Sequence, residues 1–385
     1  MLTSNIVFRT FQVKFKNSKT KKILNSLLNE KTQLIKSLGP NYKNSFLSEQ
    51  IKKYKAINDF RLIGMGGSTL GCQAIYDFLS YKIRKKFIFI DNLRTKKIKK
   101  EIKKKYVNLI ISKSGNTIET IVNSNIYINN KDQNIFITEN NENYLYNLAN
   151  KLKSEVVHHN NFIGGRYSVL SEVGMLPAEL MGLDVKKFRQ LNFLIKNKKF
   201  FNALISNVNS TLYFIKNKKF NSIIINYDES SENLFKWYQQ LIAESLGKKK
   251  KGILPIVSSM PKDNHSVMQF YLDGIRNNFF TFFFVKDKQT QNINNSNILL
   301  PQKFLKNKNL SDIIYAQKKA TENIFIKKKI PFRSFEIKKR DEKTLGELFC
   351  FFILETILIG KCLNLNPYDQ PAVELIKTET KKILI

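Results

Sequence analysis

Short apolar runs alternate with amphipathic segments along the chain from about residue 56. In the first half, the apolar runs predict four strands, at 60–64, 87–90, 108–112 and 134–138. The stretches between them predict helices at 69–79, at 96–105 and from 117 onward. Strands that alternate with helices predict βαβ units and a parallel sheet. Before this region, leucines between 24 and 34 predict one amphipathic helix.

The same alternation begins again in the second half of the chain. Further strands are predicted at 222–226, 252–257, 279–285 and 331–337, and helices at 232–244, 344–363 and 372–381. We therefore expect an α/β protein with two domains, each a mostly parallel sheet sandwiched by helices, and a C-terminal helical arm. The expected boundaries are an N-terminal helical segment at 1–52, a first domain at 53–185, a second domain at 186–342 and C-terminal helices at 343–385.

The net charge is the unusual feature of the composition. Lys and Arg total 65 against 31 Asp and Glu, a formal net charge of +34, which suggests a nucleic-acid or anionic-membrane partner as one interpretation. Only nine of the 65 cations are arginine, the residue that base readout and phosphate clamps favour. The lysines are scattered beside abundant Asn, Ile and Phe, a pattern typical of A+T-rich coding sequences. We therefore expect solvated lysine faces, with no nucleic-acid and no membrane partner.

Cysteine usage and the lack of a targeting pattern favour a cytoplasmic protein. The three cysteines form no CxxC pair and lie among apolar residues, which is typical of reduced thiols. The first residues show no basic stretch followed by a long apolar run, so no signal peptide is predicted. The most apolar segment, 345–363, contains three charged residues and predicts a buried core helix rather than a membrane span.

Two segments that follow predicted strands have the composition of anion-binding turns. Gly64-Met-Gly-Gly-Ser68 lacks the third glycine of a dinucleotide fingerprint, yet it would let backbone N–H groups approach an anion; a structural tight turn is the alternative. Ser112-Lys-Ser-Gly-Asn-Thr117 places three hydroxyl groups and an ammonium group before a helix, which suits a phosphate dianion. Helix capping alone would account for only one of these hydroxyl groups.

Four other motifs are ambiguous when each is considered alone. Paired glycines precede Arg166, and Gln240 and Glu244 have the i, i+4 spacing of one helical face. His265 stands in a polar loop, and Lys377 lies two turns into a helix. Glutamate and lysine on helices are usually solvated, and a lone histidine is more often structural than catalytic, so a structural interpretation of each stays open.

In their order and spacing, these segments resemble the glucose-6-phosphate isomerase (phosphoglucose isomerase) family, in a short form. The matching stretches are GxGGSxLG at 64–71, SKSGNTIET at 112–120, GGRYSVLS at 164–171, QLIAESLGK at 240–248, the loop of His265 and DQPAVELIK at 369–377. The resemblance implies two sugar-isomerase (SIS)-type α/β domains. It also implies reversible isomerisation of glucose 6-phosphate and fructose 6-phosphate through a cis-enediol, in glycolysis and gluconeogenesis. No metal and no other cofactor is expected, because proton transfer suffices for this reaction.

The resemblance also implies roles for individual residues. Glu244 would move a proton between C1 and C2, Arg166 would stabilise the enediolate, His265 would assist ring opening, and Lys377 would lie near the ring oxygen. The residues expected to bind the sugar or its phosphate are Gly67, Ser68, Ser112, Lys113, Ser114, Thr117, Gly165, Gln240 and Gln370. Members of this family complete the active site across a dimer, so we expect a homodimer in which His265 is supplied to the neighbouring active site.

Three other functions serve as alternatives. A dual phosphoglucose/phosphomannose isomerase would use the same residues, although the Gln370 context favours the standard enzyme. A catalytically silent sugar-phosphate regulator would lack Glu244, His265 or Arg166, and all three are present. A nucleic-acid-binding protein would cluster arginines with aromatic residues. Leu246, Asn116 and Ala372 depart from the family pattern without removing an expected catalytic group.

Overall fold

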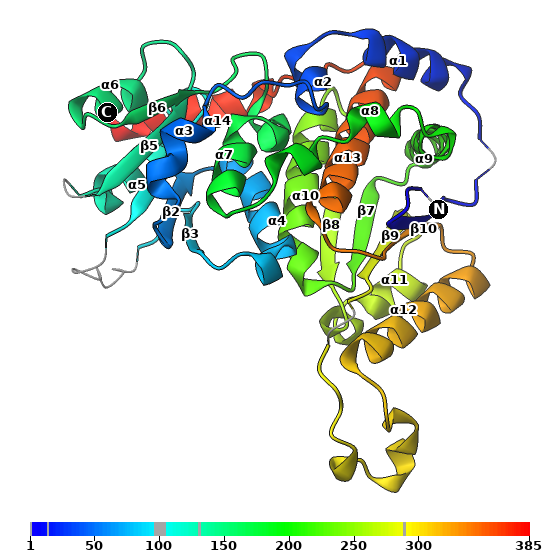
Figure 1. Ribbon diagram of the computed structural model, residues 1–385. Helices are drawn as coiled ribbons and strands as arrows, with labels where there is room; N and C mark the ends of the chain where they lie inside the picture. The colour runs from blue at the N-terminus through cyan, green and yellow to red at the C-terminus, as the bar shows by residue number, and fades with distance from the viewer. Residues whose placement is uncertain (1, 14, 96–104, 130–131, 288–289) are drawn as a thin grey trace.

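The computed structural model describes residues 1–385 apart from 1, 14, 96–104, 130–131 and 288–289. The described part contains two five-stranded sheets flanked by helices, which lie side by side (Figure 1). The predicted α/β fold with two sheet-containing domains is confirmed. The helix expected at 96–105 falls almost wholly outside the described residues.

The first sheet has five parallel strands in the order β3-β2-β4-β5-β6. They are β2 (Asp59–Gly64), β3 (Lys86–Ile90), β4 (Val107–Ile111), β5 (Gln133–Thr138) and β6 (Glu155–His158). The helices of this domain are α4 (Leu70–Phe78), α5 (Ile118–Tyr127), α6 (Tyr144–Lys151) and α7 (Glu172–Leu180). All of β4 is buried, which explains its continuous apolar run. The strand order reverses between β2 and β4, and ligands of such sheets bind outside the carboxyl ends of the strands at that point.

The second sheet is mixed and has the order β1-β10-β9-β7-β8. Its strands are β1 (Ile6–Arg9), β7 (Asn221–Asn226), β8 (Leu254–Ser259), β9 (Asn278–Val285) and β10 (Phe332–Ile337). β1 is antiparallel to β10, and the other pairs are parallel. The first 52 residues also form α1 (Ser18–Asn29), α2 (Gln33–Ser37) and α3 (Ser48–Ile51). The segment expected to be helical thus carries, beside its helices, one strand that the sequence did not predict, β1, which forms an edge of the second sheet.

Helices cover both faces of the second sheet. One face carries α8 (Leu191–Leu194), α9 (Lys198–Lys216), α10 (Glu232–Leu246) and α13 (Glu342–Cys362), and the other carries α11 (Met268–Asp273) and α12 (Leu310–Lys327). Alternate phenylalanines of β9 point to opposite faces. The Phe283 ring lies 4.9 Å from Phe235 of α10, whereas the Phe280 ring lies 4.9 Å from Phe325 of α12.

The two domains share a continuous core. α4 of the first domain packs against α10 of the second. One cluster of buried side chains includes Phe60 and Ile75 of the first domain together with Trp237 and Phe352 of the second. This packing holds the carboxyl-terminal half of α10 beside the turn that follows β2.

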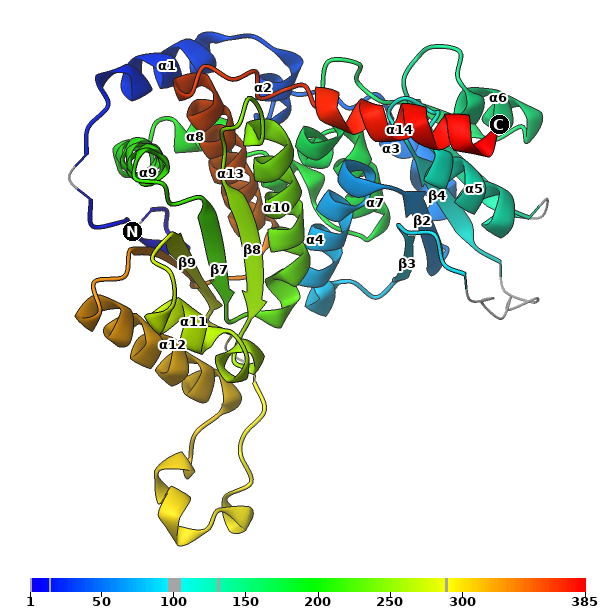
Figure 2. The ribbon, with the colours of Figure 1, turned by 180° about the vertical axis from the view of Figure 1, so that it is seen from behind.

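The two C-terminal helices have different environments. α13 is buried along almost its whole length, as expected for a core helix. Every residue of α14 (Pro371–Leu384) is exposed, and the helix extends from the second domain toward α6 (Figures 1 and 2). Within the described residues, no helix has both the length and the apolar character needed to span a membrane.

A segment between β9 and α12 projects from the body of the protein (Figure 1). We call its described part, residues 290–309, the arm. It carries two short 3₁₀ turns, Asn295–Asn297 and Leu300–Leu305. Leu299, Leu300 and Phe304 are 74%, 84% and 72% exposed, so the arm presents apolar side chains that the single chain does not cover.

Candidate active site

The glycine turn, defined here as Gly64–Ser68, lies at the carboxyl end of β2. A side-chain carbon on Gly64 would lie 2.8 Å from the Ile111 carbonyl oxygen and 3.0 Å from Ser68 Cβ. Ser68 therefore lies against the end of β4, where Ser112 begins the next loop. The two sequence segments with anion-binding composition thus meet at the point where the strand order reverses.

The hydroxyl loop, defined as Ser112–Thr117, connects β4 to α5. The hydroxyl oxygens of Ser112 and Thr117 lie 2.9 Å apart, and Ser114 Oγ accepts a hydrogen bond from the Asn116 N–H at 3.3 Å. α5 begins at the next residue, and Thr117 makes no side-chain capping hydrogen bond. Lys113 Nζ lies 3.3 Å from Glu139 Oε1. Hydroxyl groups, one cation and a helix N-terminus together provide the donors and the field that favour a phosphate.

A buried histidine supports the hydroxyl loop from behind. The His159 backbone N–H donates to the Thr138 carbonyl oxygen at 2.7 Å, and Thr138 Oγ1 donates to the Lys113 carbonyl oxygen at 3.3 Å. Burial, together with a smaller effect of the positive charge of Lys113, lowers the pKa of His159 to about 4. The imidazole is therefore neutral at pH 7 and adds no charge beside the loop.

Arg166 is a buried arginine whose guanidinium group connects separate segments. It is 3% exposed. Its Nε donates to Ser245 Oγ at 2.8 Å, and its Nη2 donates to the carbonyl oxygens of Pro367 and Asp369 at 2.8 and 3.0 Å. Its Nη1 donates to Gln370 Oε1 at 2.7 Å. The planar fork of arginine satisfies these acceptors at once, which a lysine could not do.

Both carboxylate oxygens of Glu244 accept hydrogen bonds. Oε2 accepts from Arg166 Nη1 at 3.2 Å, and Oε1 accepts from Gln240 Nε2 at 3.0 Å, one helical turn away. The Glu244 side chain is still 31% exposed, so the carboxylate is held in orientation and remains open to a ligand. Gln240 Oε1 is buried and has no hydrogen-bond partner among the described residues, which leaves an acceptor beside the carboxylate. We call Arg166, Gln240, Glu244, Ser245 and Gln370 the arginine cluster.

Glycines bring the hydroxyl loop and the arginine cluster together. A side-chain carbon on Gly67 would overlap the Gly165 carbonyl carbon and lie 2.5 Å from the Arg166 backbone nitrogen. Gly66 has a φ of +53°, and a side-chain carbon there would lie 2.8 Å from Gln240 Nε2. The glycine turn therefore contacts Ile111, the residue before the hydroxyl loop, on one side and the arginine cluster on the other. Only glycine permits both approaches.

Comparison with known proteins assigns the family. The family model described as phosphoglucose isomerase matches residues 48–385. The chain belongs to the phosphoglucose isomerase family. A glucose-6-phosphate isomerase from Methanocaldococcus jannaschii is 34% identical over 368 residues, which cover 89% of this chain and 88% of that relative. The prediction that the chain is an enzyme of this family is confirmed.

Solved structures share the fold of this phosphoglucose isomerase family member. The crystal structure of a hypothetical protein from Thermus thermophilus has a TM-score of 0.83 and 22% identity, and the match covers 95% of this chain and 94% of that one. A glucose-6-phosphate isomerase from Chlamydia trachomatis has a TM-score of 0.67 and 18% identity, covering 97% of this chain and 76% of that one. At these identities, the comparison shows the fold alone.

Two residues that the family resemblance implicates in ring opening lie apart from the arginine cluster. His265 ends the 3₁₀ turn Lys262–His265 after β8 and is exposed. Lys377 is exposed on α14, and its ammonium nitrogen lies 2.7 Å from Glu374 Oε1. In the part of the chain that the structure describes, neither residue forms a hydrogen bond or ion pair with Glu244. A single chain therefore brings together Arg166, Glu244 and their partners but leaves these two residues outside.

Sequence reasoning missed the residues that hold Arg166 in place. Ser245 Oγ lies 2.8 Å from Tyr167 Oη, and the Tyr167 hydroxyl group donates a hydrogen bond to the Pro367 carbonyl oxygen at 2.9 Å. Burial raises the pKa of Tyr167, which keeps the phenol neutral. Lys248 Nζ lies 2.6 Å from Asp369 Oδ1, and its hydrogen bond lowers the pKa of Asp369. All of these side chains lie within or directly beside the sequence stretches that match the family, and this position could have identified them as residues of the site.

Proposed function

We propose that this chain interconverts glucose 6-phosphate and fructose 6-phosphate by metal-free acid–base catalysis through a cis-enediol, in glycolysis and gluconeogenesis in the cytoplasm. The proposal rests on the Glu244 carboxylate, which Arg166 and Gln240 hydrogen-bond on both oxygens close to the hydroxyl loop. A fixed carboxylate, a fixed cation and an anion-binding loop are the groups that this isomerisation needs. Family membership supplies the substrate class.

The hydroxyl loop would hold the phosphate group of the substrate. Ser112, Ser114 and Thr117 offer hydroxyl donors, Lys113 offers a positive charge, and Ser68 approaches from the glycine turn. Phosphate binding far from the reacting carbons positions the sugar for proton transfer.

Glu244 would carry out the proton transfer on the open-chain sugar. Its carboxylate removes the proton from C2 of the aldose, which gives the enediolate, and returns that proton to C1, while the proton of the C2 hydroxyl group passes to O1, to give the ketose. Arg166 stabilises the oxyanion that develops, because its guanidinium stays charged and already lies on the same side as the carboxylate. Gln240 and Gln370 would hold sugar hydroxyl groups, and Gly67 and Gly165 would leave room for the sugar chain.

Ring opening would require a second chain. We place His265 of one chain at the active site of its neighbour, with Lys377 near the ring oxygen, in a homodimer. Three features support this arrangement: His265 is exposed, the arm carries uncovered apolar side chains, and Leu375 and Ile376 of α14 are 72% and 71% exposed. Exposed apolar surface on several separate elements is typical of a chain that assembles with a partner.

A coupled assay tests the proposed reaction directly. Purified protein is given fructose 6-phosphate in the presence of a chelator, and the appearance of glucose 6-phosphate is followed. We expect turnover without added metal. A protein that is folded and binds fructose 6-phosphate but shows no turnover would contradict the proposed activity, and turnover that the chelator abolishes would contradict the metal-free mechanism.

Mixing two inactive variants tests the shared active site. Glu244→Gln and His265→Gln are unfolded together and refolded as a mixture. If each site uses Glu244 of one chain and His265 of the other, random pairing restores about one quarter of the wild-type activity, because half of the dimers are mixed and each of these has one intact site. Mixtures that stay inactive, while the same protocol recovers the wild type, would rule out sharing.

A further inference from the structure

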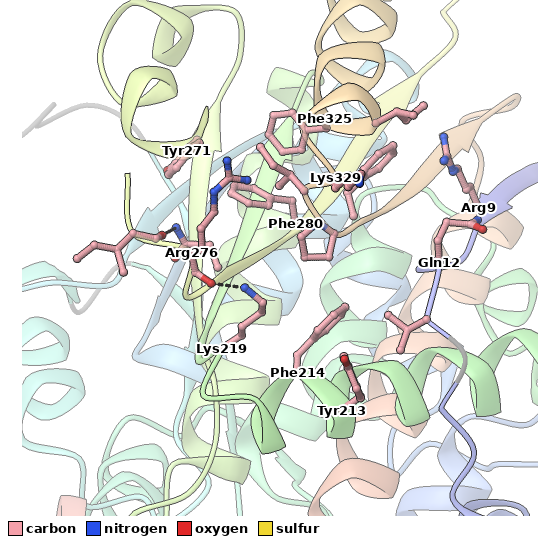
Figure 3. Close-up of a pocket in the computed structure, with 17 residues that line it drawn as sticks. Arg9, Gln12, Tyr213, Phe214, Lys219, Tyr271, Arg276, Phe280, Phe325 and Lys329 are labelled. Atoms are coloured by element: carbon pink, nitrogen blue, oxygen red, sulfur yellow. Dashed lines mark hydrogen bonds between the residues drawn. The ribbon is translucent and has the colours of Figure 1, made fainter. Parts of the chain in front are cut away.

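A cavity lies away from the residues of the proposed active site. It has a volume of about 640 Å³ and opens where β9 and β10 begin (Figure 3). The end of β1, the end of α9, the turn between α11 and β9, and the end of α12 contribute its walls. The residues that line it include none of those predicted for the active site. Its volume falls in the range typical of sites for small organic ligands.

The cavity carries positive charge that no carboxylate offsets. Arg9, Lys219, Arg276 and Lys329 line it, and its lining contains no aspartate or glutamate. In the described part of the chain, none of these four side chains forms an ion pair; Lys219 donates instead to the carbonyl oxygen of Arg276. Burial and the neighbouring charge of Arg276 lower the pKa of Lys219, which is the cost expected where cations face one another without an anion.

Two of these cations are arginines, in a chain that has only nine. The guanidinium fork matches the geometry of phosphate oxygens, which a scattered lysine surface does not. Figure 3 shows Lys219 and Arg276 together on one side of the cavity and Arg9 on the other. An anion within the cavity would therefore meet positive charge from both sides.

The remaining walls combine aromatic side chains with aliphatic ones. Phe214, Phe280, Phe325 and Phe332 line the cavity from the core, and the Tyr213 side chain is 37% exposed at its edge. Rings of this wall pack against one another, and the Phe280 and Phe325 centroids lie 4.9 Å apart. A flat apolar ring gains more from such a wall than a sugar would. The amides of Gln12 and Asn278, which also line the cavity, can hydrogen-bond the polar edge of a base.

We propose that this cavity binds a nucleoside polyphosphate. The base lies against the phenylalanine wall, and the phosphate groups contact Arg9, Lys219, Arg276 and Lys329. Because the cavity contains no residue of the predicted active site, the bound nucleotide is an effector or a second ligand rather than the substrate. This binding does not depend on the proposed isomerase activity.

Calorimetric titration of the full-length protein with ATP tests the proposal. The test variant is Arg276→Ala combined with Lys329→Asn; Lys329 has a φ of +54°, a conformation that asparagine tolerates. The matched control combines Arg84→Ala with Lys153→Asn, because Arg84 and Lys153 are exposed in the first domain and Lys153 has a φ of +49°. We expect the Kd of ATP to rise at least about tenfold in the test variant, which corresponds to about 1.4 kcal/mol, and to stay unchanged in the control.

Two further ligands and one further variant sharpen the result. Tripolyphosphate and adenosine, tested separately, should each bind at least about tenfold more weakly than ATP, because each keeps only one of the two kinds of contact. Lys219→Gln should also weaken ATP binding, which provides a second variant should the double variant be poorly folded. No ATP binding at millimolar concentration, equal binding by tripolyphosphate, or an unchanged Kd in the folded variants would overturn the proposal. Competition between ATP and fructose 6-phosphate that survives both variants would also overturn it, because the nucleotide would then occupy the active site.

Discussion

The arginine cluster and the pair His265–Lys377 belong to one proposed active site, yet they differ greatly in burial and hydrogen bonding within a single chain. Arg166 is 3% exposed and donates five hydrogen bonds, whereas Lys377 is exposed and pairs only with neighbouring Glu374 among the described residues. A group held by buried hydrogen bonds is preorganised to stabilise charge. An exposed side chain must be ordered when its partner arrives. In the proposed mechanism, the groups for the enediol step would therefore be held in place within each chain, whereas those for ring opening would become ordered only when two chains assemble.

The largest effect is expected at Glu244, the proposed base in the arginine cluster. Glu244→Gln keeps the shape of the side chain but removes the carboxylate, so kcat should fall by about 10²- to 10⁴-fold. Glu232→Gln, on the same helix, is the matched control, because Glu232 is partly exposed and pairs with Lys236 at 3.0 Å. Steady-state kinetics on both variants measure the difference. A folded Glu244→Gln variant with near-normal kcat would place the base elsewhere.

The next effect concerns the fork of Arg166. Arg166→Lys keeps the charge, but a lysine cannot donate hydrogen bonds to Ser245, Gln370 and the two carbonyl oxygens at the same time. The value of kcat should therefore fall by about 10²- to 10³-fold. The free energy of unfolding should also fall, by about 1–3 kcal/mol for each buried acceptor left unpaired. Arg84→Lys, at an exposed position, is the control for both measurements. If stability falls and kcat does not, Arg166 is a structural residue only.

The buried support of the hydroxyl loop should show itself in the pH dependence of stability. Burial lowers the pKa of His159 to about 4, so the unfolded chain binds a proton that the folded chain excludes. The contribution of this group to the free energy of unfolding is therefore fully present above about pH 6.5. It is lost as the pH drops toward 4, which lowers the free energy of unfolding by up to about 3 kcal/mol. Urea unfolding should show that the free energy of unfolding decreases less between pH 8 and pH 5 for His159→Asn than for wild type. Equal losses would contradict the burial of a neutral imidazole.

The smallest effect is expected on the exposed half. Lys377→Gln should lower kcat by about tenfold, since one hydrogen-bond donor to the ring oxygen is lost. Its melting temperature should stay unchanged, because an exposed i, i+3 ion pair contributes at most a few tenths of a kcal/mol. Lys381→Gln on the same helix is the control for both readings. A fall in melting temperature without a change in kcat would contradict this prediction, because Lys377 would then support the fold and not the reaction.

The sequence predicts the interior strands of both sheets and two of the four edge strands, β3 and β8, but misses the edge strands β1 and β6. β4 and β9 are completely buried, and their apolar runs stand out. β1 and β6 have four residues each and lie at sheet edges, where a short run resembles a loop. α12 was also missed, because its buried positions include Lys318 and Glu322, which pair at 2.9 Å and interrupt the apolar periodicity.

The site followed from motif recognition rather than from periodicity. Arg166 and Glu244 are 78 positions apart, and no spacing rule places them in contact. Ser245 was missed because a small polar residue near a helix end usually lies on the surface, whereas here it is buried under Arg166. The cavity proposed to bind a nucleotide corresponds to no sequence motif, because the residues that line it extend from Arg9 to Phe332 and come together only after folding.

The position of β1 has a consequence for synthesis on the ribosome. Ile6 is made long before its partner in the sheet, Ile337, which follows 331 residues later. At about 5–20 residues per second, this partner is made on the order of tens of seconds after β1. During that interval the first domain can complete its own sheet, whereas the second sheet lacks its last parallel strand. The edge of β9 then stays open to other chains, and this interval is when a nascent chain of this protein has the greatest need of a chaperone.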